Sequence, residues 1–166
     1  MIKSQFMHPW LVFLILMLKS GRRPTPEQHY EWYLQQFEKE IGSGPSYSHE
    51  LERVGKQAFG PKFDGVFAAD QIPRRFSSII ANLDNSDEKG SHWIAIARAA
   101  PRKKYLVYDS FGRKTSKIIG HGVGHLETYD TEGDAEQTKA EDNCGPRSLA
   151  WLKVFFTLGP RAAAQI

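Results

Sequence analysis

Apolar residues recur at helical spacing in three segments of the first half of the chain. Thr25-Pro26-Glu27-Gln28 combines a capping hydroxyl, a first-turn proline and a glutamine three residues after the cap. Helix-spaced apolar residues follow it as far as Ile41, and Gly42 is suited to end that helix. We predict a second helix that Ser48 caps and that runs to Ala58, and a third over the apolar positions between Ile72 and Leu83.

The second half of the chain contains shorter apolar runs that are typical of strands. His92–Ala97 and Tyr105–Tyr108 are joined by a turn-prone segment at residues 100–103, which predicts an antiparallel hairpin. A further strand is expected near Val123–Tyr129, and a last helix from about Gly145 or Pro146 to the Gly159-Pro160 stop. Helices before and after a small, mainly antiparallel sheet indicate the α+β class.

Length and composition indicate one globular domain. The chain has 166 residues, of which 40% are hydrophobic and 25% charged, with 14 glycines and 9 prolines. These values exclude a collagen-like or largely disordered chain. We expect a single domain over residues 25–166, preceded by an N-terminal segment, residues 1–24.

The N-terminal segment contains an apolar run, Trp10–Leu18, which is shorter than the roughly 20 residues of a membrane-spanning helix. We therefore expect no integral membrane insertion. Three interpretations stay open: a helix buried against the domain or a partner, a segment outside the functional domain with Met17 as the true start, and a secretory signal. The signal ranks last because no small-residue cleavage pattern follows the run.

Cys144 is the only cysteine, which excludes an intramolecular disulfide and a zinc site with two thiolates, and indicates a reducing, intracellular compartment. It lies in Asp142-Asn143-Cys144-Gly145-Pro146, where the last helix is predicted to begin. Unpaired N–H groups and the helix dipole favour a thiolate there. The alternative is a small buried hydrophobic residue, the commonest state of a free cysteine.

Three further side chains fit a reaction in which Cys144 is the nucleophile. In the predicted hairpin His92 and Asp109 lie opposite each other, or within a residue or two, so that Asp109 orients the imidazole that takes the thiol proton. Gln137 precedes Cys144 in a polar loop, and its amide can share a developing oxyanion with the Cys144 N–H. Taken singly, each has an ordinary structural explanation: a sheet-edge histidine, a turn aspartate and a surface glutamine.

The order His92, Asp109, Gln137, Cys144 resembles the adenain family of adenoviral cysteine endopeptidases. The resemblance covers about residues 65–158, including Gly65–Pro73, Gly90–Ala97, Tyr105–Gly112 and Asn143-Cys144-Gly145, with the same intervals between His92 and Asp109 and between Gln137 and Cys144. The wider group to which this family belongs includes the SUMO-deconjugating proteases, which share this order.

The resemblance implies a circularly rearranged papain-like fold and a peptidase that cuts viral precursor proteins after small residues such as glycine, in the host nucleus and the virion. Cys144 is then the nucleophile, His92 the base and acid, Asp109 its orienting group and Gln137 part of the oxyanion hole. Trp93, Asn143 and Gly145 would contact the substrate. The chemistry requires no cofactor.

The chain also departs from that family. The family has glutamate at the position of Asp109, and its activating peptide binds through a cysteine that has no counterpart here, so any peptide activation would be non-disulfide. Activation by DNA would use the basic residues Arg102, Lys103 and Lys104, which otherwise form a solvated hairpin tip. Because Ile166 follows Cys144 sooner than in the family, part of the substrate groove is expected to be missing or supplied by the N-terminal helices.

Other functions stay open from the sequence. A ubiquitin-like-modifier deconjugase and a catalytically silent virion or binding protein on the same fold are the alternatives to an endopeptidase. His121 and His125 have the spacing of two metal ligands on one helix face, but the surrounding glycines argue against a helix, so no metal site is expected.

Overall fold

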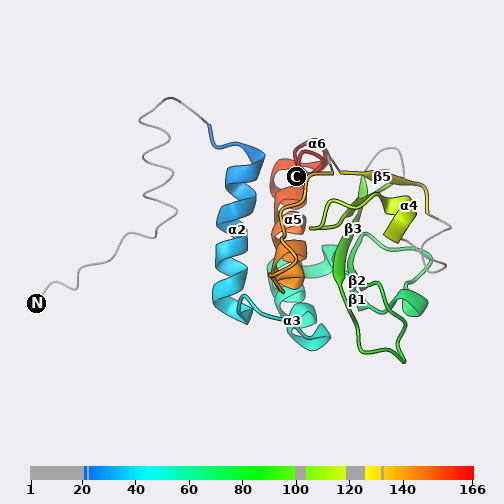
Figure 1. Ribbon diagram of the computed structural model, residues 1–166. Helices are drawn as coiled ribbons and strands as arrows, with labels where there is room; N and C mark the ends of the chain where they lie inside the picture. Colours follow the sequence, from blue (N-terminus) through cyan, green and yellow to red (C-terminus); the bar gives the residue numbers. More distant parts are fainter. Residues whose placement is uncertain (1–20, 22, 100–103, 119–125, 132) are drawn as a thin grey trace, which may run out of the picture.

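A five-stranded sheet packed against helices forms the body of the protein (Figure 1). The computed structural model describes residues 21, 23–99, 104–118, 126–131 and 133–166. The elements in chain order are α2 (Pro26–Ile41), α3 (Ser48–Phe59), η1 (Gly60–Lys62), β1 (Gly65–Phe67), η2 (Ala69–Gln71), β2 (Ser78–Asn82), β3 (Trp93–Ala99), β4 (Lys104–Tyr108), α4 (Thr115–Ile118), β5 (Thr128–Asp130), α5 (Cys144–Leu158) and α6 (Pro160–Ala163).

The sheet is mixed, with the strand order β1-β2-β3-β4-β5. The inner pairs β2/β3 and β3/β4 are antiparallel, whereas the edge strands β1 and β5 run parallel to their neighbours. The antiparallel pairing of β3 and β4 is confirmed, whereas the predicted turn at residues 100–103 lies outside the described residues. Strand β5 overlaps the end of the predicted strand region, whose residues 123–125 are also outside the described residues. The expectation of a mainly antiparallel sheet is corrected to a mixed one, within a fold of mixed helix and sheet.

The predicted helices before and after the sheet are confirmed, with small changes at their ends. Thr25 and Gln28 form the expected capping box of α2, and Gly42, with φ of +90°, ends it. Helix α3 begins at Ser48, but its cap is Tyr47 and not Ser48. The last helix begins one residue earlier than predicted, at Cys144 itself.

The predicted helix between Ile72 and Leu83 is wrong, since this region contains β2. All five residues of β2 are buried, and β1 and β3 cover both of its edges. A short apolar run that is buried on both faces has no alternation to distinguish it from a buried helix. The two β-branched residues Ile79 and Ile80 and the break at Pro73 favour the strand.

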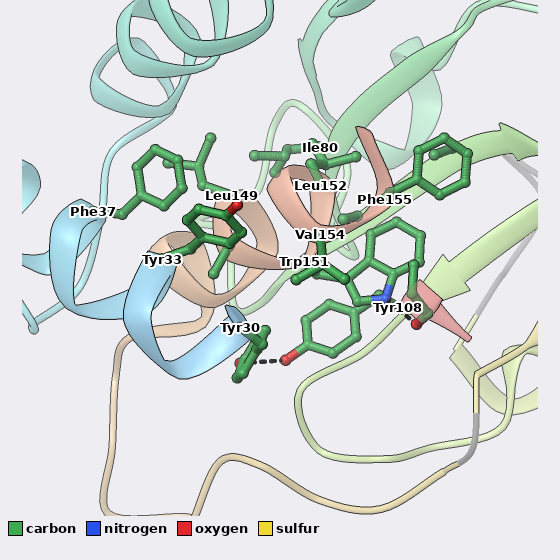
Figure 2. Close-up of a cluster of buried hydrophobic side chains, with 14 of the residues drawn as sticks. Tyr30, Tyr33, Phe37, Ile80, Tyr108, Leu149, Trp151, Leu152, Val154 and Phe155 are labelled. Carbon is green, nitrogen blue, oxygen red and sulfur yellow. Dashed lines mark hydrogen bonds between the residues drawn. The ribbon is translucent and has the colours of Figure 1, made fainter. Parts of the chain in front are cut away.

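Helix α5 lies between α2 and the sheet (Figure 1), and this packing fixes the position of Cys144. Ala95 and Ala97 of β3 face the helices, and their small side chains allow α5 to approach the sheet closely. Trp151 of α5 is fully buried and stacks on Tyr108 of β4 at 5.5 Å between ring centroids. Figure 2 shows this cluster, in which the Tyr30 hydroxyl of α2 is hydrogen-bonded to that of Tyr108.

Nothing in the described residues forms a helix of the length and apolar character needed to cross a membrane. The apolar run Trp10–Leu18 and its three interpretations lie outside the described residues.

Candidate active site

The antiparallel pairing of β3 and β4 brings His92 and Asp109 to the same end of the sheet. His92 directly precedes β3, and Asp109 directly follows β4. The register pairs Ala95 with Tyr108, so its continuation places Asp109 opposite Ile94, diagonally across from His92. This is within the offset that the sequence predicted. A diagonal neighbour is within reach of a long or aromatic side chain.

His92 Nε2 and Asp109 Oδ1 are 2.6 Å apart, and both side chains are buried. Burial by itself would raise the pKa of Asp109, but hydrogen bonds from His92 and Arg113 lower it to about 2. The carboxylate is therefore ionised at neutral pH and can only accept a hydrogen bond. It follows that Nε2 carries a proton and donates it, which leaves Nδ1 as the free ring nitrogen.

The Cys144 thiol lines the same cleft as the His92 ring and influences its pKa. Burial lowers the pKa of His92, but hydrogen bonds to Asp109 and Cys144 outweigh that effect and hold the pKa above its usual value. With Nε2 occupied by Asp109, Nδ1 is the atom available to the sulfur. The three side chains thus form a chain in which a proton can leave the thiol for an imidazole that a carboxylate orients.

Cys144 is held in place by the packing of the first turn of α5. The Ser148 hydroxyl donates to the Trp93 carbonyl of β3 at 3.3 Å, which fixes the helix across the strand that follows His92. A Cβ on Gly145 would lie 2.8 Å from Ser46 and 2.9 Å from Leu51. Glycine at position 145 therefore allows α3 and the loop before it to approach this turn.

Gln137 is fixed next to this group by both ends of its amide. Its Oε1 accepts from the Ser110 hydroxyl at 2.6 Å, and its Nε2 donates to the Glu141 carbonyl at 2.5 Å. Its backbone N–H donates to the Ser110 carbonyl, which ties the loop to the residue after Asp109. A primary amide has two N–H donors. One is used by Glu141, and the other is available to a ligand.

A cleft of about 600 Å³ lies over these residues and is lined by His92, Trp93, Gln137 and Cys144. The loop between α2 and α3 forms part of the wall and is attached to the site through Trp93, whose indole N–H donates to the Ser46 carbonyl at 3.0 Å. The Ser46 hydroxyl is buried without a hydrogen-bond partner. The cleft thus combines a thiol side chain with room for a ligand.

Asn143 and Gly145, expected to contact a substrate, do not line this cleft. The Asn143 amide donates to Glu38 of α2 at 2.7 Å, and its carbonyl accepts from Arg147 of α5 at 2.8 Å. Arg147 also donates to Glu141 at 3.1 Å and to the Tyr30 hydroxyl. These contacts connect the loop that carries Gln137 to two helices, so Asn143 acts in the structure of the site.

Glu136, the neighbour of Gln137, has a titration range unusual for a carboxylate. Burial raises its pKa to about 7, although its own backbone N–H and the Tyr108 hydroxyl partly offset that effect. The folded state therefore holds a proton on Glu136 that the unfolded chain loses near pH 4.5. The stability that this proton provides is complete below pH 4.5 and is lost as the pH rises through about 7.

We expect Glu136→Gln to stabilise the protein at pH 8 by about 1 kcal/mol and to change little at pH 4, because the amide resembles the protonated acid. Urea unfolding at the two pH values measures this difference. Asp142→Asn is the control, since Asp142 is an exposed carboxylate of the same loop. Equal effects of Glu136→Gln at both pH values would contradict the assignment.

Two residues of the site were not predicted from the sequence. Arg113 Nε donates to Asp109 Oδ2 at 2.6 Å, and the Phe111 ring stacks on His92 at 4.8 Å between centroids. The spacing of Asp109 and Arg113, an acid and a base four residues apart, was the available signal, but outside a helix such a pair has no fixed geometry. Gly112, which lies between Phe111 and Arg113 in the chain, has a φ of +63°. A Cβ at position 112 would lie 2.5 Å from the carbonyl oxygen of Gly133.

The remaining expectations concern ions and polyanions. Within the described ranges, no three His, Cys, Asp or Glu residues are grouped as metal ligands, and His121 and His125 lie outside these ranges. Arg102 and Lys103 also lie outside them. Lys104 forms an ion pair with Glu127 and lies 4.6 Å from the centre of the Tyr129 ring.

The geometry of the site is the basis for any functional conclusion about this chain. Neither a protein-family model nor a curated protein matches it.

Proposed function

We propose that the protein is a cysteine endopeptidase of the adenain type, which hydrolyses peptide bonds after small residues such as glycine in viral precursor proteins. The observation that carries the proposal is the hydrogen bond between Asp109 and His92 at the wall of an open cleft that Cys144 also lines. A buried structural cysteine has no need of an imidazole that a carboxylate orients. We also propose that the arrangement of helices and sheet is the circularly rearranged papain-like fold.

The chemistry follows from the positions of the donors and acceptors. His92 Nδ1 takes the Cys144 proton, and the thiolate attacks the carbonyl carbon of the scissile bond. The N–H groups in the first turn of α5 have no partner within the helix, and that of Cys144 together with the free Gln137 N–H would stabilise the oxyanion. The His92 imidazolium then protonates the leaving amine as the C–N bond breaks, and a thioester remains on Cys144.

Hydrolysis of the thioester uses the same groups in reverse. Neutral His92 takes a proton from water, whose oxygen attacks the thioester carbonyl. The C–S bond breaks, the carboxylic acid product leaves, and Cys144 recovers its proton from His92. In both steps, every proton transfer takes place through the His92 ring.

A set of fluorogenic peptides with glycine or alanine before the scissile bond tests the proposal, with and without added DNA. A ubiquitin-like protein with a reporter on its di-glycine tail is the comparison substrate. Cleavage of short peptides supports the endopeptidase, whereas cleavage of the di-glycine reporter alone supports a deconjugase. No cleavage of either substrate, with a correctly folded protein, would contradict both.

The reactivity of Cys144 provides a test that needs no substrate. Iodoacetamide should label Cys144 near neutral pH about tenfold faster in the wild type than in His92→Ala, because the imidazole accepts the thiol proton. His49→Ala is the matched control, since His49 is an exposed histidine that stacks on Tyr47 at the wall of the cleft. Equally slow labelling of the wild type and His92→Ala would favour a catalytically silent protein.

A further inference from the structure

Arg113 and His92 contact the same carboxylate from two sides. Arg113 donates through Nε to Asp109 Oδ2 at 2.6 Å and through Nη2 to Oδ1 at 3.3 Å, while His92 bonds to Oδ1 at 2.6 Å. Asp109 is 3% exposed, and the side chain of Arg113 is 40% exposed. The buried Asp109 carboxylate therefore interacts with one permanent cation, Arg113, and with one titratable ring, His92.

The Phe111 ring contacts the same two groups. It stacks on the His92 ring at an interplanar angle of 29°, and the guanidinium carbon of Arg113 lies 5.3 Å from its centre. The Phe111 N–H also donates to Asp109 Oδ1 at 3.2 Å. The segment from Asp109 to Arg113 thus forms a compact support for the imidazole, and Arg113 is its only positive charge.

We propose that Arg113 is a positioning residue whose charge, shared with Asp109, lets the carboxylate orient His92 without holding the imidazolium proton too tightly. This inference rests on the proposed function, because proton release matters only when His92 must protonate a leaving amine. A general acid works best when its pKa is close to the working pH. An unshared buried carboxylate at 2.6 Å would move the His92 pKa away from that range.

Other charges that face His92 are the same in all the variants to be compared. The thiol of Cys144 raises the pKa of the ring, and the cleft is also lined by Asp84, Glu88 and Lys89 after β2 and by Lys139, Glu141 and Asp142 before α5. Replacement of Cys144 by alanine removes the thiol, which is the one group of this set that influences the His92 pKa. A change at residue 113 in that background therefore reports the charge on Arg113.

The test is an NMR titration of the His92 ring in the full chain carrying Cys144→Ala, with the signal assigned by His92→Ala. We expect Arg113→Gln to raise the pKa of His92 by about half a unit to one unit, because the attraction of Asp109 is no longer shared. Arg113→Lys, which keeps the charge, and Lys114→Gln, at the exposed neighbour, should leave it within about 0.2 unit. An unchanged or lower pKa in Arg113→Gln, or equal shifts in the Gln and Lys variants, would overturn the inference.

The activity gives a second, independent measurement. In the protein with Cys144 intact, the acid limb of kcat/KM against pH should move upward in Arg113→Gln by the same amount as the NMR pKa, because His92 must be neutral to take the Cys144 proton. If Arg113→Gln cleaves peptides with an unchanged pH dependence of kcat/KM, the role of Arg113 is refuted, but the proposed peptidase activity is still supported. If Arg113→Gln raises the His92 pKa but the wild-type protein cleaves no substrate, the peptidase proposal is refuted, whereas the effect of the Arg113 charge on His92 is confirmed.

Discussion

Replacement of Cys144 by alanine is expected to abolish peptide cleavage, with a loss of at least about 10⁴-fold in kcat. Cys144 is the only thiol in the chain, and it lines the cleft together with His92, whose pKa it raises. The remaining groups could still bind a peptide in the cleft. Substrate binding should therefore persist in the variant, and chemistry should not.

Stability must be shown to be unaffected before this loss is assigned to chemistry. Cys144 is small and lies at the wall of the cleft, so alanine removes one atom beside open space, and we expect less than about 1 kcal/mol of destabilisation. Thermal unfolding of the variant and the wild type checks this point. A folded Cys144→Ala protein that turns over peptide at the wild-type rate would end the peptidase proposal.

The outer helices and the central hairpin could be predicted because each has a local signal. The capping box at Thr25 acts through neighbours in sequence, and the antiparallel pairing of β3 with β4, the next strand along the chain, brings His92 and Asp109 together with little further information. Strand β2 lacked such a signal. Its residues are buried on both faces, and only the strands on either side of it decide its conformation.

The supports of the site were harder to predict than its reactive groups. Asn143 looked available to a substrate because it adjoins Cys144, but its partner Glu38 lies on a helix far away in sequence. The same holds for Trp93, whose indole binds the carbonyl of Ser46 in a loop that the sequence did not connect with the site. Reactive residue types are visible in a sequence, whereas the contacts that orient them depend on how distant elements pack.

Gln137→Ala is expected to lower kcat by about 10² to 10³-fold, equivalent to about 3 to 4 kcal/mol of transition-state stabilisation, and to change KM little. The amide is held by Ser110 and by Glu141, so its free N–H keeps its direction before any substrate arrives. A donor that is fixed in advance stabilises the oxyanion without the cost of reorientation. Steady-state kinetics on the best fluorogenic peptide separates kcat from KM.

Two further variants distinguish an oxyanion donor from a merely structural glutamine. Gln137→Glu keeps an acceptor for Ser110 but removes both N–H groups and introduces a negative charge, so it should be at least as inactive as Gln137→Ala. Ser110→Ala removes only the hydroxyl that orients the amide, and we expect about a tenfold loss in kcat. A Gln137→Ala protein within threefold of the wild-type kcat would show that the Cys144 N–H stabilises the oxyanion without this side chain. A lower free energy of unfolding in that variant would then assign the Gln137 hydrogen bonds to the structure of the loop alone.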